Sequence, residues 1–221
     1  SKALARTEVH HITMREGVPP CGGICVETNI DSTPPTDRGR APGNRARGAA
    51  VRSAVAVDPV VVGKPNTPLY ELSASVLGTG IGRTLAIGDR LDTDVMGATA
   101  AGMDSLFVLG GVHGWSDLAG VESAARPRYV ATDLRSLHSV YVDAERHETD
   151  GSRWTCGEAS AWVSAAGELT LGPGGAINER LRVGLRAVWD AHDVQGSMID
   201  PLGGDGAELS RELDLAAGLE R

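Results

Sequence analysis

Three carboxylates lie within one short turn, because residues 88–94 read Gly-Asp-Arg-Leu-Asp-Thr-Asp. A hard cation such as Mg²⁺ prefers oxygen ligands held in a fixed geometry of this kind. Asp89 directly follows an apolar run and is the best candidate ligand. Asp94 either supports such a site or complements the positive end of a helix that begins here, whereas Asp92 is expected to be solvated. The turn therefore predicts a metal site centred on Asp89.

A second candidate for chemistry is Lys64, which stands between Gly63 and Pro65. Gly63 permits close approach of the backbone, and Pro65 restricts the turn that follows. A lone lysine at a strand end is usually only a surface residue. A lysine and a metal ion beside one crevice, however, suit phosphate binding and charge stabilisation during phosphoryl transfer.

Both candidates follow predicted strands. Short apolar runs at 60–62, 84–88 and 105–109 predict buried strands. Predicted helices alternate with these strands, which indicates right-handed crossovers and hence a doubly wound, Rossmann-like parallel sheet of the α/β class. Ligands of such sheets bind at the carboxyl ends of the strands, where Lys64 and Asp89 are both predicted to lie.

The helices between these strands have start and stop signals. Thr67 is predicted to cap a helix in which Pro68 is the first residue and Gly78 the stop, and Thr93 is predicted to cap the next helix. The apolar residues of the first helix fall on one face: Leu69, Leu72 and Val76.

The composition excludes several classes of protein. The 221 residues contain 21 Lys and Arg against 29 Asp and Glu, a net charge of −8, which argues against a nucleic-acid partner. No window approaches the apolar length of a membrane span, and no secretory signal is recognised, so a cytoplasmic protein without a membrane partner is expected. The three cysteines (Cys21, Cys25 and Cys156) are expected to be free thiols.

Beyond residue 145 the pattern changes to short segments broken by glycines, followed by a helix, which predicts a small separate α+β unit. That helix has an apolar face comprising Ile177, Leu181, Leu185, Val188 and Trp189. The six histidines, His113 among them, lack the spacing of metal ligands and are expected to be surface or packing residues.

Residues 24–115 resemble the haloacid dehalogenase superfamily of phosphatases, in the 4-nitrophenylphosphatase-like branch with a large α/β cap domain. The segments that carry the resemblance are Thr-Asn-Ile-Asp (28–31), 35–39, Ala-Pro-Gly-Asn (41–44), Val-Gly-Lys-Pro (62–65) and 87–94. Residues 126–129 and 133–138 are similar to members that carry an additional small domain, which is itself similar to part of an acetyltransferase fold. The resemblance thus implies a remnant of the cap and hinge at 1–43, the C-terminal part of the core at 44–140 and the small domain at 150–221.

The resemblance also implies an activity, which is Mg²⁺-dependent hydrolysis of a small phosphomonoester such as glycerol 3-phosphate. Lys64 would hold the substrate phosphate, Asp89 would bind Mg²⁺ and Asp94 would support the metal site. A turn near the end of the cap would contact the substrate through Asn29, Asp31 and Asn44.

One required motif is not found in the sequence. These phosphatases attack phosphorus with the first aspartate of an Asp-x-Asp-Gly motif that follows an apolar strand, and the 221 residues contain no such motif. The chain is therefore expected to be part of a phosphatase that does not turn over by itself. The missing strand would pair beside residues 84–88, so an exposed sheet edge and self-association are expected.

Two alternatives remain. The chain could be an inactive remnant that binds a phosphorylated ligand or a partner through Lys64 and the acidic turn. An acyl-CoA-binding role would need a glycine-rich turn that opens a helix, and residues 172–175 (Gly-Pro-Gly-Gly) are the one candidate. Such a stretch is more often a plain loop.

Overall fold

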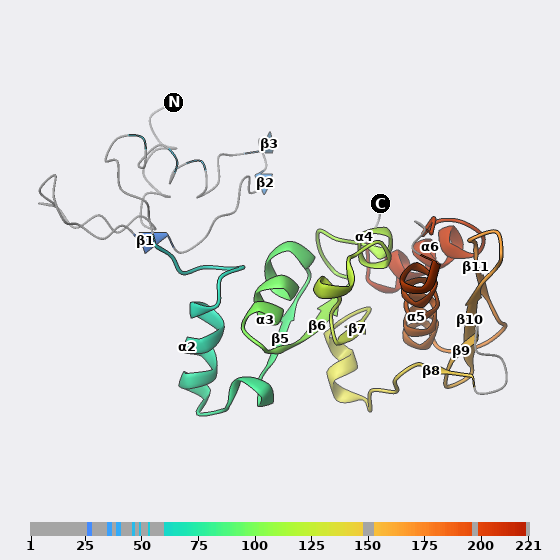
Figure 1. The fold of residues 1–221 in the computed structure, drawn as a ribbon, viewed down its shortest axis with the longest axis horizontal. Helices are drawn as coiled ribbons and strands as arrows, with labels where there is room; N and C mark the ends of the chain where they lie inside the picture. The colour runs from blue at the N-terminus through green and yellow to red at the C-terminus, as the bar shows by residue number, and fades with distance from the viewer. Residues whose placement is uncertain are drawn as a thin grey trace, which may run out of the picture. The chain divides into compact units, whose positions relative to one another are not determined.

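The computed structural model describes residues 60–147, 153–195 and 199–219, the backbone of three short strands at 26–27, 35–36 and 39–40, and single positions at 46, 49 and 53 (Figure 1). The chain divides into two units, residues 1–81 and residues 82–221. The sequence also predicts a helix over 44–56, and this segment lies almost entirely outside the described residues.

In the first unit, β4 (Val60–Val61) pairs in parallel with β1 (Val26–Glu27), and β2 (Pro35–Thr36) pairs with β3 (Gly39–Arg40) in antiparallel. Helix α2 (Pro68–Leu77) begins with Pro68 in its first turn, and Gly78 ends it in the left-handed conformation at φ 66°, as predicted. Thr67 is the N-cap residue, as predicted, but its side chain makes no capping hydrogen bond.

The predicted burial in this unit is also wrong. Val60 is 54% exposed, and the residues of α2 that are buried are Tyr70 and Ala74. The apolar face predicted from spacing is exposed instead, comprising Leu69, Leu72 and Val76. Spacing identifies which residues share a helix face, but it does not identify which face meets a partner.

The second unit contains a parallel sheet that includes two of the three predicted strands, those at 84–88 and 105–109. The strand predicted at 60–62 lies in the first unit as β4, the third strand of the sheet was not predicted, and Leu85 and Ile87 of the strand at 84–88 are exposed, although that strand was predicted to be buried. Strands β5 (Leu85–Gly88), β6 (Asp104–Val108) and β7 (Tyr129–Ala131) lie side by side in that order, all parallel (Figure 1). The 3-10 helix η2 (Ile81–Arg83) precedes β5, and the connections between the strands include α3 (Met96–Ala100), α4 (Trp115–Ala119) and the 3-10 helix η4 (Ser123–Ala125). Because β5 and β6 pair in parallel, their carboxyl ends are adjacent.

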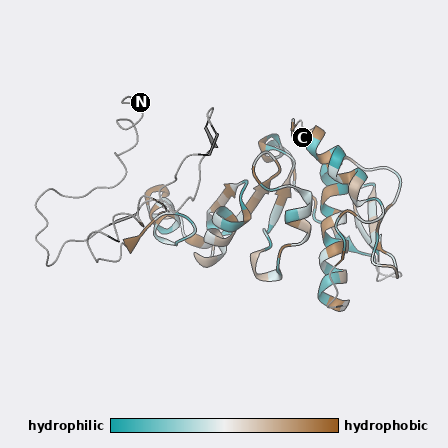
Figure 2. Ribbon diagram, turned by 90° about the horizontal axis from the view of Figure 1, so that it is seen from above, coloured by the Kyte–Doolittle hydropathy of each residue, from teal (hydrophilic) through white to brown (hydrophobic). Residues whose placement is uncertain are grey.

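The C-terminal part has the predicted α+β arrangement. Strands β8 (Glu145–Arg146), β9 (Arg153–Cys156), β10 (Ala159–Val163) and β11 (Leu169–Leu171) form an antiparallel sheet. Helix α5 (Ile177–Gln195) packs on this sheet and against α6 (Gly206–Ala216) (Figure 1). Both helices carry hydrophobic as well as hydrophilic residues along their length (Figure 2). The predicted likeness to part of an acetyltransferase fold stays a prediction.

One apolar core connects the parallel sheet with the C-terminal part. Trp115 is 1% exposed, and its Nε1–H donates to the carbonyl of Pro201 at 2.7 Å. Trp189 of α5 donates in turn to the carbonyl of Leu118 at 3.1 Å. These two tryptophans satisfy polar atoms inside the core, so the C-terminal part holds α4 in place beside the carboxyl ends of the strands.

Two further predictions can be compared with the described residues. Cys156 is a free, buried thiol, and burial raises its pKa above the usual value. The other two cysteines lie outside the described residues. No helix within the described ranges is both long enough and apolar enough to cross a membrane.

Candidate metal and phosphate site

Asp89 follows the last residue of β5 at the carboxyl end of the parallel sheet. The backbone N–H of Val112, in the loop after β6, donates to Asp89 Oδ2 at 3.3 Å. A side chain at Gly111 would overlap this carboxylate, because a Cβ there would already lie 2.7 Å from Asp89 Cβ. Asp89 is therefore held by a neighbouring loop that can come close only because residue 111 is glycine.

Asp94 performs a different task from Asp89. Its side chain is 7% exposed, and its Oδ2 accepts hydrogen bonds from the N–H groups of Asp89 and Arg90 at 3.2 and 3.1 Å. Gly88 has no room for a side chain because Asp94 occupies that space. Of the two interpretations offered by the sequence, these contacts favour support of the turn that presents Asp89.

The helix after this turn differs from the prediction. Leu91–Val95 form a π-helix, η3, which continues into α3, and Thr93 lies inside η3 instead of capping it. The N-cap residue is Arg90, whose side chain makes no cap. The predicted cap at Thr93 is thus wrong, because the helix begins two residues earlier, at Leu91.

Asp92 is half exposed, as predicted, but it is also paired with Arg90 at 2.7 Å. The hydrogen bond from Arg90 lowers the pKa of the Asp92 carboxyl below its usual value. Asp92 is therefore directed at the Arg90 side chain and takes no part in the contacts that hold Asp89.

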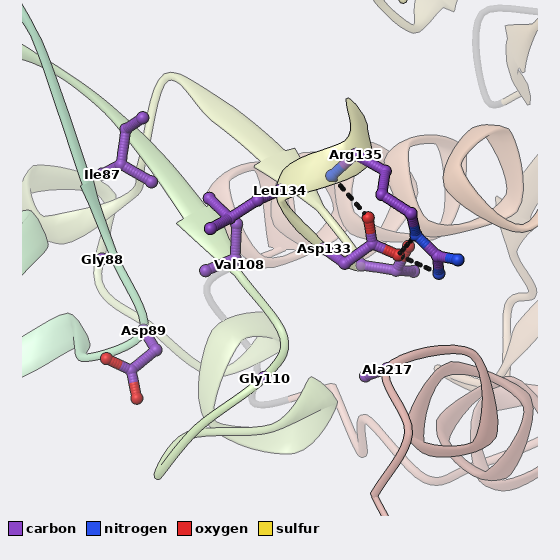
Figure 3. A pocket seen from close by; sticks show the side chains of 10 residues that line it. Ile87, Gly88, Asp89, Val108, Gly110, Asp133, Leu134, Arg135 and Ala217 are labelled. Atoms are coloured by element: carbon purple, nitrogen blue, oxygen red, sulfur yellow. Dashed lines mark hydrogen bonds and ion pairs between the residues drawn. The ribbon is translucent and has the colours of Figure 1, made fainter. Parts of the chain in front are cut away.

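A cavity of about 580 Å³ opens at the carboxyl ends of β5, β6 and β7 (Figure 3). Asp89 lies on one side of it, and Asp133 and Arg135 lie on the other. Arg135 is paired with Asp133 through Nη2 at 2.5 Å, and this hydrogen bond lowers the pKa of Asp133. The remaining lining residues are Ile87, Gly88, Val108, Gly110, Thr132, Leu134 and Ala217.

Asp89 suits Mg²⁺ as a partial site. Mg²⁺ commonly takes one or two carboxylates and completes its shell with water and substrate phosphate. Within the described ranges, no group of three or more His, Cys, Asp or Glu side chains could hold a metal ion. Asp89 is a single fixed carboxylate beside a cavity, so it would supply one ligand, and the rest would come from solvent, substrate or other residues.

Lys64 lies in the first unit, on a turn after β4. Its side chain is exposed, and its peptide bond to Pro65 is cis. The N–H and side-chain amide of Asn66 both donate to the carbonyl of Gly63, at 3.0 and 3.1 Å, which closes the turn. The other predicted substrate residues, Asn29, Asp31 and Asn44, lie outside the described residues.

The sequence pointed to Gly111 and Val112 after β6 through the family resemblance, but it gave this loop no role in the site. Gly111, Val112 and His113 all contribute to the acidic turn, and the N–H of Leu91 donates to His113 Nδ1 at 2.9 Å. The local signal for this loop in the sequence is the glycine pair directly after the strand. His113 was expected to be a surface or packing residue. Its contact with Leu91 depends on how two loops lie against each other, which the spacing of residues in the sequence does not indicate.

The contacts at the glycine-rich turn before α5 do not favour binding of an anion. Glu179 accepts a hydrogen bond from the N–H of Ala176 at 2.9 Å. An acyl-CoA pyrophosphate would need the amides at such a helix start, but a carboxylate already satisfies one of them and adds negative charge. This contact disfavours the acyl-CoA alternative.

Comparison with known families agrees with this geometry. The HAD-hydrolase-like family model matches residues 61–137, which include Lys64, the acidic turn and the loop after β6. Residues 61–137 belong to the haloacid dehalogenase-like hydrolase family. The predicted family is thereby confirmed, and the parallel sheet described above is the HAD-like part of this α/β fold.

Two curated HAD-like relatives align with part of the chain. The D-glycerol 3-phosphate phosphatase of Mycobacterium tuberculosis is 46% identical over 117 residues, which are 53% of this chain and 33% of the relative. A 5′-nucleotidase of Bacillus subtilis is 41% identical over 91 residues, which are 41% of this chain and 36% of the relative. The chain thus spans about a third of the length of these relatives.

A solved HAD-like structure resembles a larger share of the chain. The crystal structure of a glycerol phosphate phosphatase from Mycobacterium tuberculosis in complex with magnesium is 32% identical, with a TM-score of 0.61. The match covers 91% of this chain and 57% of that protein. The similarity therefore extends beyond residues 61–137.

Proposed function

We propose that this chain is part of a Mg²⁺-dependent phosphomonoester hydrolase that acts on glycerol 3-phosphate or a similar small phosphate ester. The observation that carries the proposal is the fixed carboxylate of Asp89 beside the cavity at the carboxyl ends of the sheet. The names of the relatives supply the substrate class, since one is a glycerol 3-phosphate phosphatase and another a nucleotidase.

Each candidate residue has a separate role in this proposal. Asp89 would bind Mg²⁺, and Asp94 would hold the turn that presents Asp89. Bound Mg²⁺ supplies Lewis-acid stabilisation of charge on the phosphoryl oxygens. Lys64 would bind the substrate phosphate, and Asn29, Asp31 and Asn44 are proposed to contact the rest of the substrate.

The nucleophile is the missing part of this mechanism. Hydrolysis through a phosphorylated enzyme needs a carboxylate that attacks phosphorus and a group that protonates the leaving oxygen. The sequence contains no Asp-x-Asp-Gly motif, and Asp89 already occupies the end of β5. We therefore expect these 221 residues to bind Mg²⁺ but not to turn over.

The test compares this chain with a version extended upstream to include an Asp-x-Asp-Gly motif. Phosphate release from glycerol 3-phosphate and 4-nitrophenyl phosphate is measured with Mg²⁺ and with EDTA. Activity in the extended version alone, abolished by Asp89→Ala and strongly reduced by Lys64→Ala, is the expected result. Activity that is indifferent to Asp89→Ala would refute the proposal.

The missing motif favours one alternative, in which the chain binds a phosphorylated ligand without hydrolysing it. This alternative predicts Mg²⁺-dependent phosphate binding that Lys64→Ala and Asp89→Ala both weaken, with no activity even in the extended version. Isothermal titration calorimetry with inorganic phosphate, run beside the activity assay, distinguishes the hydrolase from a protein that only binds phosphate.

We also propose self-association through β5. Among the described strands, β5 has a neighbour on one side only, and Leu85 and Ile87 are 39% and 43% exposed. Open strand edges with apolar side chains pair readily with other strands. Sedimentation velocity should show a concentration-dependent oligomer that Ile87→Lys disperses, and a monomer at all concentrations would contradict this proposal.

A further inference from the structure

The start of η3 is held by side chains at three consecutive backbone amides. The first N–H groups of a helix have no partner within the helix itself. Asp94 accepts from the N–H of Arg90, the N-cap residue, and from the N–H of Asp89, which precedes it. The third, the N–H of Leu91, donates to His113 Nδ1 at 2.9 Å. His113 therefore completes the set of contacts that holds the acidic turn.

His113 belongs to the loop after β6, and this loop contacts the turn in both directions. The N–H of Val112 donates to the carboxylate of Asp89, while the N–H of Leu91 donates to the imidazole of His113. Gly111 precedes Val112 and His113 in this loop, and a side chain at Gly111 would overlap Asp89. The two loops are thus fastened together on either side of the carboxylate.

The hydrogen bond specifies how the imidazole is used. A ring nitrogen that accepts a hydrogen bond carries no proton, so the neutral imidazole of His113 has its proton on Nε2. His113 is half-buried. The accepting atom of His113, Nδ1, is bonded to Cγ. An asparagine side chain has an acceptor, Oδ1, at the same position, whereas a leucine side chain has no acceptor.

We propose that His113 is a positioning residue for the metal-binding carboxylate: by accepting the Leu91 amide, it fixes the loop after β6 against the turn that presents Asp89. The proposal rests on the proposed function of Asp89 as a Mg²⁺ ligand. His113 touches neither metal nor substrate in this role. It acts through the position of the turn and of the Val112 amide.

The test measures Mg²⁺ affinity of the full 221-residue chain by isothermal titration calorimetry for four proteins: the unchanged chain, Asp89→Ala, His113→Leu and His113→Asn. We expect Asp89→Ala to abolish binding and His113→Leu to weaken it about 3- to 10-fold, the amount that one neutral hydrogen bond is worth. His113→Asn should restore affinity to within about twofold of the unchanged chain, because it replaces the acceptor.

A direct measurement accompanies the titrations. In ¹⁵N-labelled protein, scalar coupling across the hydrogen bond between the Leu91 amide nitrogen and His113 Nδ1 should be observed, and absence of this coupling overturns the proposal. Thermal unfolding of each variant shows whether the fold is retained.

The outcomes separate the two proposals. If Asp89→Ala leaves Mg²⁺ affinity unchanged, the metal site itself is wrong, and the role of His113 fails with it. If Asp89→Ala abolishes binding but His113→Leu does not weaken it, or His113→Asn weakens it as much as leucine does, the metal site stands and the positioning role is refuted. Should His113→Leu fail to fold, the asparagine variant and the coupling measurement decide.

Discussion

Adding one methyl group at Gly111 should damage the metal site without damaging the fold. A Cβ at this position would lie 2.7 Å from Asp89 Cβ and overlap the carboxylate. Non-bonded carbon atoms prefer about 3.5–4.0 Å, so Asp89 Cβ would have to move by about 1 Å, and the carboxylate oxygen, which the new Cβ would overlap, would have to move further. The backbone of Gly111 does not have a positive φ, so alanine is compatible with its conformation.

The size of the effect follows from the contact that is lost. Displacement of Asp89 breaks the hydrogen bond from the Val112 amide, and a hydrogen bond to a charged group is worth about 1.5–3 kcal/mol. We therefore expect Gly111→Ala to weaken Mg²⁺ binding by about 10- to 100-fold. Misplacement of a reacting group by about 1 Å has similar consequences for catalysis.

The neighbouring glycine provides the control. A Cβ at Gly110 meets nothing within 4 Å, although Gly110 lines the same cavity. Calorimetric titration with Mg²⁺ should show loss of affinity in Gly111→Ala and little change in Gly110→Ala, while circular dichroism shows folded protein in both. Equal affinity in the two variants would refute the argument that Gly111 makes room for Asp89.

Three further changes probe contacts at this site and elsewhere in the fold. Asp94→Ala leaves two amides without their acceptor and should lower the free energy of unfolding, measured in urea, by about 1–3 kcal/mol, and Mg²⁺ affinity with it. Trp115→Phe should cost about 1–3 kcal/mol in the same assay because the carbonyl of Pro201 loses its donor. The hydrogen bond from Arg126 lowers the pKa of Asp193, so this pair stabilises the fold above the unfolded pKa of about 4, and the stabilisation is lost as pH falls through the folded pKa. Because Asp193 is half exposed, Asp193→Asn should lower the free energy of unfolding at pH 7 by less than about 1 kcal/mol. The difference between the two proteins should shrink at acidic pH, where Asp193 is protonated, as measured by urea unfolding at both pH values.

The parallel sheet could be predicted because its signals are local. An apolar run that ends in Gly88 and Asp89 indicates a strand with a polar residue at its carboxyl end, and the structure has this arrangement. Gly78 ends α2 because a left-handed residue is needed there, and glycine adopts that conformation at little cost. Both predictions depend on a few adjacent residues alone.

Predictions that depended on distant partners could not succeed from sequence. Thr93 has the residue type of a helix cap, but the π-helical turn places it inside η3, and it is Asp94 that accepts from the amides of Asp89 and Arg90. The acceptor for Leu91 comes from His113, 22 residues along the chain, so no local pattern indicates it. In each case the missing information was which loop lies against the turn.

The charges around the cavity suggest an order of binding in the proposed reaction. The described lining has two carboxylates, Asp89 and Asp133, and one guanidinium, Arg135, which is already paired with Asp133. A phosphate group carries roughly two negative charges at neutral pH, so this lining alone would repel it. A divalent cation at Asp89 would reverse the sign of the local charge, since a bound metal ion is often the largest charge in a site. Metal binding should therefore precede phosphate binding, and a further cation would have to meet the remaining charge.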